Sequence, residues 1–266
     1  EQGAAREATT VALPDDPQRP VAIVFTSGTT GAPKGALFCN RQLSAITAVD
    51  HGDTWAKGGR ALVGTAMAHL GFMTKFAGNM RQGGCSWLTS RWRAEDALAF
   101  TERHRLTSVG GIPTQIALML RVPDFDRYDL SSVHMIVVGG GPATPALVSE
   151  ARRRFRAGFM VRYSCTEAAI GLGTSPTDPA EDAELSVGRP LAGVQLALLD
   201  EEDRLVGAGE VGAVCLRSPA IMSGYWGGPE ASAAAFTSDG FVRTGDLGWL
   251  DEHGRLRLAG RSKEMY

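Results

Sequence analysis

Short apolar runs alternate with amphipathic stretches over the first two thirds of the chain. "VAIVF" at 21–25 and "VHMIVVGG" at 133–140 have the length and the β-branched content of buried strands. The stretch "AEDALAFTERH" at 94–104 spaces its apolar residues three and four apart, which predicts a helix with one buried face. This alternation predicts an α/β fold, with a layered, largely parallel sheet flanked by helices.

The other expected elements follow the same alternation. Asn40 is a good N-cap for a helix that follows it, Gly83 and Gly84 end a later helix, and Pro145 suits a first helical turn. Strands are expected at 21–25, 60–67, 85–90, 106–110, 133–140 and 159–164, and helices after residue 40 and at 72–82, 94–104, 113–120 and 144–155.

The pattern changes after about residue 185. Short alternating runs such as "VQLALLD" and "RLRLAG" dominate, and "PEASAAAF" at 229–236 is the main helical stretch. This predicts a small antiparallel β subdomain with a barrel-like form. Residues 1–20 are polar and indicate a tail or linker, so the expected division is 1–20, 21–185 and 186–266.

Composition narrows the class of protein. The chain has 266 residues, of which 44% are hydrophobic and 21% charged, as in ordinary soluble proteins. A net charge of -2 argues against a nucleic-acid partner, and no apolar run approaches the ~20 residues of a membrane span. The four cysteines form no C-x-x-C pair, which favours reduced thiols in a cytoplasmic protein.

"FTSGTTGAPKG" at 25–35 follows an apolar run and combines glycines, hydroxyls and one lysine. Glycines let the backbone turn its N–H groups toward an anion, hydroxyls donate further bonds, and Lys34 adds a mobile charge. The loop therefore suits a polyphosphate, although a plain glycine-rich turn is the alternative. It matches neither the Walker pattern nor G-x-G-x-x-G.

Each of three later motifs can be interpreted either as part of a ligand site or as a plain structural feature. Gly139 to Gly141 follow a strand, where bare backbone can lie against a flat ring or simply turn the chain. Tyr163 in "YSCTEAAIG" offers a stacking face, and Glu167 is a natural Mg²⁺ ligand or else a solvated acid. Asp246 in "RTGDLG" can accept bonds from a sugar's hydroxyls or satisfy its own turn.

Taken together, the motifs resemble one family. "TSGTTGAPKG", "YSCTE", "GYWGGPEASAAAF…DGFVRTGD" and "GRSKE", in this order, resemble the acyl-adenylate-forming (AMP-binding) superfamily, over about residues 21–266. That superfamily includes acyl-CoA synthetases, luciferases and the adenylation domains of peptide synthetases. The set most resembles an acyl-CoA synthetase or fatty-acid–CoA ligase, and it implies a central fragment of the large N-terminal domain, without the mobile C-terminal domain that carries the adenylating lysine.

The resemblance also implies the nucleotide contacts. Tyr163 would stack on adenine, Asp246 would bind the ribose hydroxyls with Arg261 nearby, and Thr166 would contact the α-phosphate of ATP. Glu167 would bind Mg²⁺. The adenine would be lined by Gly140, Gly141 and Pro142, and the β- and γ-phosphates would be held by Thr26, Ser27, Gly28, Thr29, Thr30, Gly31 and Lys34.

Two further roles are implied outside the nucleotide contacts. His69 matches the histidine that gates the acyl pocket, and with Thr166, Glu167 and Lys34 it completes the implied catalytic set. Lys263 falls at the hinge between the large and small domains. The chain departs from the family at Ser164, where glycine is usual, and at Ala66, where proline is usual.

These residues imply ATP-dependent activation of a carboxylic acid to an acyl-adenylate, followed by thioester formation with coenzyme A. The expected pocket residues are small or apolar, which favours a fatty or aryl acid: His69, Phe72, Gly111, Ile112, Gly139, Ala168 and Gly173. Transfer to a carrier-protein thiol stays open as an alternative, as does a non-catalytic nucleotide-binding module. We expect the 266-residue chain alone to make little acyl-adenylate. Its oligomeric state is open.

Overall fold

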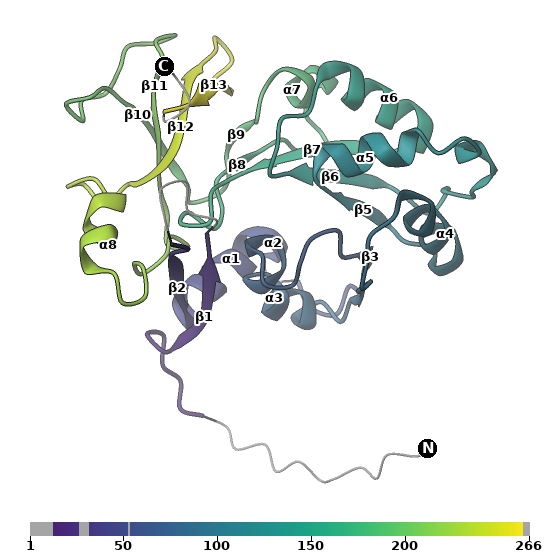
Figure 1. Ribbon diagram of the computed structural model, residues 1–266, viewed down its shortest axis with the longest axis horizontal. Coiled ribbons are helices and arrows are strands. Elements are labelled where there is room, and N and C mark those ends of the chain that lie inside the picture. The colour runs from purple at the N-terminus through teal and green to yellow at the C-terminus, as the bar shows by residue number, and fades with distance from the viewer. Residues whose placement is uncertain (1–12, 27–31, 53, 263–266) are drawn as a thin grey trace.

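Three sheets organise the protein, as the computed structural model describes it over residues 13–26, 32–52 and 54–262 (Figure 1). A seven-stranded sheet has the order β4-β3-β5-β6-β7-β8-β9, and a separate four-stranded antiparallel sheet has the order β10-β11-β12-β13. A two-stranded sheet pairs β1 with β2. The predicted fold class, a helix-flanked and largely parallel sheet with a separate antiparallel part, is confirmed.

The seven-stranded sheet is parallel from β4 to β7 and antiparallel at β8 and β9. Its strands are β3 (Arg60–Leu62), β4 (Cys85–Trp87), β5 (Ser108–Gly111), β6 (Met135–Gly139), β7 (Gly158–Tyr163), β8 (Leu172–Gly173) and β9 (Arg189–Pro190).

Helices cover one face of this sheet. Ile136 and Val138 of β6 alternate with half-buried neighbours and share a core with Leu98, Ile116 and Val148, and these last three come from three different helices. The covering helices are α4 (Ala94–His104), α5 (Pro113–Leu120), α6 (Pro145–Phe155) and α7 (Ala180–Leu185), with a short 3-10 turn, η1 (Phe125–Arg127). The bounds of α4 and α5 are those expected, and Pro145 begins α6.

The four-stranded sheet packs against the loop that follows β7. Val214, Leu216 and Val242 of the sheet share one buried cluster with Ala168 and Ile170 of that loop. The strands are β10 (Gln195–Leu199), β11 (Gly212–Arg217), β12 (Val242–Leu250) and β13 (Leu256–Arg261), and α8 (Pro229–Ala235) precedes β12.

The phosphate-loop motif connects a β-hairpin, which differs from the expected succession of strand, loop and helix. β1 (Pro20–Phe25) pairs antiparallel with β2 (Gly35–Cys39), outside the seven-stranded sheet. β2 was not expected because it is buried on both sides, with Ala36 and Phe38 fully covered, so it shows no polar alternation.

The N-cap assigned to Asn40 is wrong. α1 (Asn40–His51) begins at this residue, and Cys39 holds the cap position. The Asn40 side chain instead donates to the Asp16 carbonyl at 2.9 Å, while the Gln42 side chain accepts the Cys39 N–H at 3.0 Å. The amide is therefore used to fix the chain before β1.

The helix expected at 72–82 is divided into α2 (Leu70–Met73) and α3 (Phe76–Arg81). Gly83 follows with a positive φ of 63°, which agrees with its expected role at the helix end. No helix among the described residues is both long and apolar enough to span a bilayer.

Candidate active site

The loop after β7 joins two groups of the residues selected from the sequence. On one side, the Tyr163 hydroxyl donates to Asp246 Oδ2 at 2.8 Å. Arg261 Nε lies 3.2 Å from the other oxygen of the same carboxylate. Three of the implied nucleotide contacts, from β7, β12 and β13, therefore meet at Asp246.

Asp246 is held by the local backbone as well as by these side chains. Gly245 adopts a positive φ of 80°, the Asp246 N–H donates to Thr244 Oγ1 at 3.1 Å, and the strand register pairs Asp246 with Arg261. Burial raises the pKa of Tyr163, and the Asp246 charge raises it further, so the phenol stays a protonated donor. The Tyr163 ring itself is only 8% exposed.

On the other side, Glu167 meets a residue that the sequence reasoning gave no role. The Tyr225 hydroxyl donates to Glu167 Oε1 at 2.5 Å, and Lys34 Nζ lies 5.2 Å from the centre of the Tyr225 ring. The Met222 N–H also donates to the Glu167 carbonyl at 2.9 Å. The available signal was the "GYWGGPE" part of the family motif, which contains Tyr225.

The ends of the phosphate loop are joined by the hairpin. The Thr26 N–H donates to the Lys34 carbonyl at 2.9 Å, and the Lys34 side chain is exposed. Thr166 is half-buried beside Glu167. Six expected site residues lie outside the described residues: Ser27, Gly28, Thr29, Thr30, Gly31 and Lys263.

The adenine and acyl candidates lie at strand and helix ends. Gly140, Gly141 and Pro142 are exposed at the end of β6, and Gly140 has a positive φ of 73°. His69 is exposed and caps α2, because its Nδ1 accepts the Gly71 N–H at 3.2 Å. The His69 ring is therefore fixed at the start of a helix in this structure.

The candidate acyl surface contains a cation that the sequence reasoning did not consider. Arg162 of β7 pairs with Gly139 of β6 on one side and with Gly173 of β8 on the other. Its guanidinium passes close to Gly173, since a Cβ atom added to Gly173 would lie 2.5 Å from Arg162 Nη1. Nη1 donates to the Thr174 carbonyl at 2.7 Å. Burial lowers the pKa of Arg162. The surface next to the two glycines is therefore less apolar than expected.

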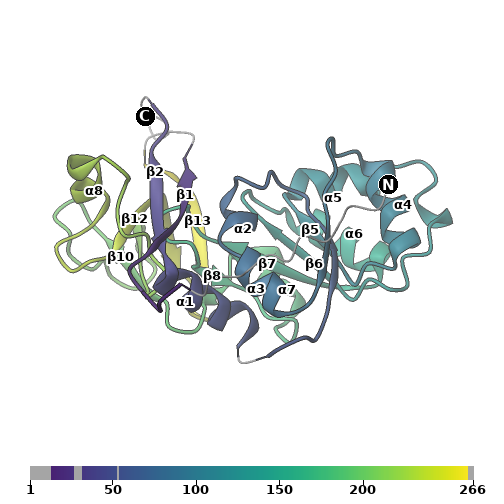
Figure 2. The same ribbon diagram turned by 90° about the horizontal axis from the view of Figure 1, so that it is seen from below.

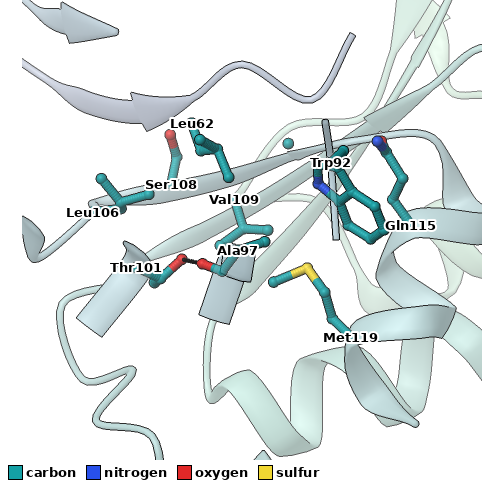
Figure 3. Close-up of a pocket in the computed structure, with 10 residues that line it drawn as sticks. Leu62, Trp92, Ala97, Thr101, Leu106, Ser108, Val109, Gln115 and Met119 are labelled. Carbon is teal, nitrogen blue, oxygen red and sulfur yellow. Dashed lines mark hydrogen bonds between the residues drawn. The ribbon is translucent and has the colours of Figure 1, made fainter. Parts of the chain in front are cut away.

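A separate cavity lies inside the α/β layer, between the β3–β5 strands and helices α4 and α5 (Figure 3). Two of its polar side chains are bonded within the protein: Thr101 Oγ1 donates to the Ala97 carbonyl at 2.7 Å, and Gln115 Nε2 donates to the Gly64 carbonyl at 2.7 Å. None of the implied nucleotide contacts lines it, so we do not assign a ligand to this cavity.

Glu167 fits a magnesium ion that is shared with phosphate. The described residues contain no group of three or more acidic, histidine or cysteine side chains that could hold a metal alone. Mg²⁺ commonly uses only one or two carboxylates, with phosphates and waters completing its shell. A single carboxylate beside the phosphate loop therefore matches this mode of binding.

The family model for "AMP-binding enzyme" matches residues 1–226. The chain belongs to this family. It is 30% identical over 251 residues to the medium/long-chain-fatty-acid–CoA ligase FadD8 of Mycobacterium tuberculosis, covering 94% of this chain and 44% of that protein. It is 32% identical to the fatty acid–[acyl-carrier-protein] ligase ScoC of Streptomyces coeruleorubidus, covering 93% of this chain and 49% of that protein.

A solved structure of the amide bond synthetase McbA from Marinactinospora thermotolerans matches with a TM-score of 0.87 and 32% identity. The match covers 99% of this chain and 53% of that one. The chain thus spans about half the length of the relatives that it matches.

Proposed function

We propose that this chain forms the nucleotide- and acyl-binding part of an enzyme that uses ATP to convert a carboxylic acid into an acyl-adenylate. One observation supports this most strongly. The short segment 163–167 joins two groups of side chains. At one end Tyr163 meets Asp246 and Arg261, a group suited to a ribose. At the other end Glu167 meets Tyr225, whose ring faces Lys34, a group suited to a metal-bound phosphate. Family membership agrees with this arrangement.

In the proposed reaction, a carboxylate oxygen attacks the α-phosphorus of ATP, the bond to the β-phosphate oxygen breaks, and pyrophosphate leaves. Asp246 would accept bonds from the ribose hydroxyls, while Lys34 and the hydroxyls of the phosphate loop would hold the β- and γ-phosphates. Thr166 would donate to the α-phosphate. Such fixed donors lower the barrier by stabilising charge that develops in the transition state.

Glu167 would hold Mg²⁺ against the phosphates. When bound, the ion would neutralise phosphate charge as pyrophosphate leaves. The part of this chain is to orient the Glu167 carboxylate, which accepts the Tyr225 hydroxyl, while the bond from Met222 N–H holds the Glu167 backbone.

The acceptor in the second step is proposed to be the thiol of coenzyme A. Its sulfur would attack the acyl carbonyl, the bond to the AMP oxygen would break, and AMP would leave. The relatives keep two alternatives open, since one is named as a carrier-protein ligase and another as an amide bond synthetase. Cys39, Cys85, Cys165 and Cys215 are free thiols, which suits the cytoplasmic location that we propose.

A fatty or aryl acid remains the proposed substrate class. FadD8 and ScoC are both named for fatty acids, which supports the fatty choice. Arg162 restricts this choice of substrate. A purely apolar acid could bind only if the Arg162 guanidinium stayed bonded to the Thr174 carbonyl.

The test is pyrophosphate release by the intact protein with ATP, Mg²⁺ and a panel of fatty and aryl acids. We expect release that depends on the acid, followed by AMP formation when coenzyme A is added. Acid-dependent pyrophosphate release without acyl transfer to coenzyme A, and so without release of AMP, would direct the search to carrier-protein or amine acceptors. ATP binding with no acid-dependent release would support a non-catalytic nucleotide-binding module instead.

A further inference from the structure

Tyr225 lies between two residues of opposite charge that the proposed reaction uses. Its hydroxyl donates to Glu167 Oε1 at 2.5 Å, while its ring faces Lys34 Nζ at 5.2 Å from the ring centre. The two contacts use different parts of the side chain, namely the polar tip and the aromatic face. One side chain therefore touches both the implied metal carboxylate and the phosphate-loop lysine.

The backbone around Tyr225 is fixed on both sides. Residues 224–226 pair with β2: Leu37 N–H donates to the Gly224 carbonyl at 2.9 Å, and Trp226 N–H donates to the Gly35 carbonyl at 2.8 Å. The Tyr225 N–H donates to Ser232 Oγ of α8 at 2.8 Å. The side chain therefore projects from a backbone that is bonded to the phosphate-loop hairpin.

The carboxylate partner is fixed from the same segment. Met222 N–H donates to the Glu167 carbonyl at 2.9 Å, three residues before Tyr225. Gln42, fully buried in α1, donates to Ser223 Oγ at 2.9 Å and to the Ile221 carbonyl at 3.1 Å. The distance between Glu167 and Tyr225 is thus set by a short and well-bonded stretch of chain.

The chemistry of a tyrosine matters at this place. A phenol is an uncharged donor, and here its hydroxyl donates to Glu167 Oε1. A hydrogen bond from a neutral donor orients a carboxylate without cancelling its charge, and an aromatic face supports an ammonium without cancelling its charge. An acidic or basic residue in this position would neutralise one of the two.

We propose that Tyr225 is a positioning residue that fixes Glu167 Oε1, so that Oε2 is presented to the metal, and that supports Lys34 facing the phosphates. This rests on the proposed function, in which both partners act on Mg·ATP. The predicted consequence is that loss of the hydroxyl changes the metal dependence of nucleotide binding, whereas loss of the ring also changes nucleotide binding without metal.

The experiment compares Tyr225→Phe and Tyr225→Leu in the intact protein. Binding of ATP is measured at increasing Mn²⁺, with bound Mn²⁺ followed by electron paramagnetic resonance. A hydrogen bond to a charged group accounts for about a tenfold change or more, so Tyr225→Phe should raise the Mn²⁺ concentration for half-maximal binding about tenfold. Metal-free ATP affinity should change less than twofold, because the ring remains under Lys34.

Tyr225→Leu should raise the metal requirement to a similar extent and also weaken metal-free ATP binding about threefold, as expected for loss of a cation–π contact. Tyr128→Phe is the matched control. Tyr128 lies after η1 and its hydroxyl accepts a bond from Arg127, well away from the site residues in the sequence and on another element. This variant should leave both quantities unchanged.

A double variant separates positioning from general packing. In a Glu167→Gln background, Tyr225→Phe should change the metal requirement less than twofold, because the carboxylate that it orients is gone. An unchanged metal requirement in Tyr225→Phe, or an equal further change in the Glu167→Gln background, would overturn the proposal. Pyrophosphate release by the unmutated protein tests the proposed reaction separately, since metal-dependent ATP binding is measured without turnover.

Discussion

Glu167 is the residue for which the site makes the clearest kinetic prediction. Glu167→Ala should lower acid-dependent pyrophosphate release by about 10²–10³, the usual effect of removing one electrostatic contact to a reacting group. Metal-free ATP affinity should change little, because the ribose contacts at Asp246 are intact. Steady-state kinetics at saturating Mg²⁺ is the measurement.

The control for this variant is Glu150→Ala. Glu150 is an exposed acid of α6 whose contact is a salt bridge to Arg153 at 2.6 Å, so it removes a carboxylate without touching the site. Equal rates for Glu167→Ala and the unmutated protein would remove Glu167 from the metal assignment.

Asp246 gives a prediction about binding. Asp246→Asn keeps the shape and the bond from Tyr163 but loses the negative charge, so ATP affinity should fall about tenfold. The melting temperature should change little. Asp203→Asn is the control, because Asp203 is an exposed acid next to Arg243, at 2.6 Å, and exposed pairs contribute little.

Isothermal titration with ATP and a thermal melt decide this case together. If the Asp246→Asn protein melts much earlier while its ATP affinity is kept, the aspartate serves the local structure of β12 around Gly245 and not the ribose.

At the scale of elements, a buried ion cluster joins the two larger sheets. Arg255, only 3% exposed, donates to Asp182 Oδ1 of α7 at 2.7 Å and to Asp251 Oδ2 at 2.8 Å. The backbone reinforces the junction, since Leu256 N–H donates to the Gly188 carbonyl at 2.9 Å. This contact helps to hold the two sheets in place, together with the buried cluster that they share.

Arg255→Ala should therefore destabilise the fold, by at most about 3–5 kcal/mol, because Asp182 and Asp251 lose their buried cation and keep only the more exposed Arg189 and Arg257. Burial alone would raise the pKa of Asp251, but bonds from the Arg255 backbone and guanidinium lower it well below its usual value. Burial likewise opposes the lowering of the pKa of Asp182, and the bonds from Arg189 and Arg255 outweigh it.

A carboxylate whose pKa is lower in the folded than in the unfolded protein stabilises the fold at pH values above its unfolded pKa of about 4. That stabilisation is lost as the pH falls from the unfolded pKa through the folded pKa. Melting temperatures between pH 7 and pH 3 should thus fall for the unmutated protein mainly below about pH 4, and the Arg255→Ala curve should be flatter there. Arg204→Ala, in an exposed pair with Asp200, is the control. Parallel curves for Arg255→Ala and the unmutated protein would contradict this role.

The elements also show which features could be predicted from the sequence. α4 and α5 were placed correctly because amphipathic spacing and Pro113 are local signals. The β1–β2 hairpin was missed because β2 is covered on both sides by distant parts of the chain, so its burial is a tertiary property. Asn40 was misassigned because its amide serves Asp16, a partner that no local pattern reveals.

The candidate site follows the same division. The resemblance to the family selected Tyr163, Asp246 and Arg261, and the structure brings them together. Tyr225 and Arg162 were missed because the importance of each comes from contacts with other elements. Tyr225 contacts Glu167 and Lys34. Arg162 contacts Gly173 and Thr174. Side-chain contacts between separate elements leave no periodic signal in one sequence.

For the whole molecule, the site lies where the three sheets meet. The seven-stranded sheet occupies one side, and the β1–β2 hairpin with the four-stranded sheet occupies the other, with β8 at the junction (Figure 2). Tyr163 ends β7 of the seven-stranded sheet, and the loop that leads on to β8 carries Thr166 and Glu167. Asp246 and Arg261 belong to the four-stranded sheet, and Lys34 lies next to β2, so the implied ATP contacts come from all three sheets. A ligand bound there would tie together parts of the chain that are otherwise joined by few covalent connections.

Mg·ATP should therefore stabilise the protein as a whole. A ligand present at about 100 times its dissociation constant adds about 2.7 kcal/mol, which for a protein of this size raises the melting temperature by about 5–10 °C. ATP without metal should give a smaller rise, and Asp246→Asn should require about tenfold more ATP for the same rise. Scanning calorimetry with ATP, with Mg·ATP and with Mg²⁺ alone is the measurement.

The ligand should move a single unfolding transition upward as a whole, because the contacts span all three sheets. If only part of the unfolding transition shifted, the nucleotide would be held by one sheet alone, and the joint site at the Tyr163–Glu167 loop would be refuted.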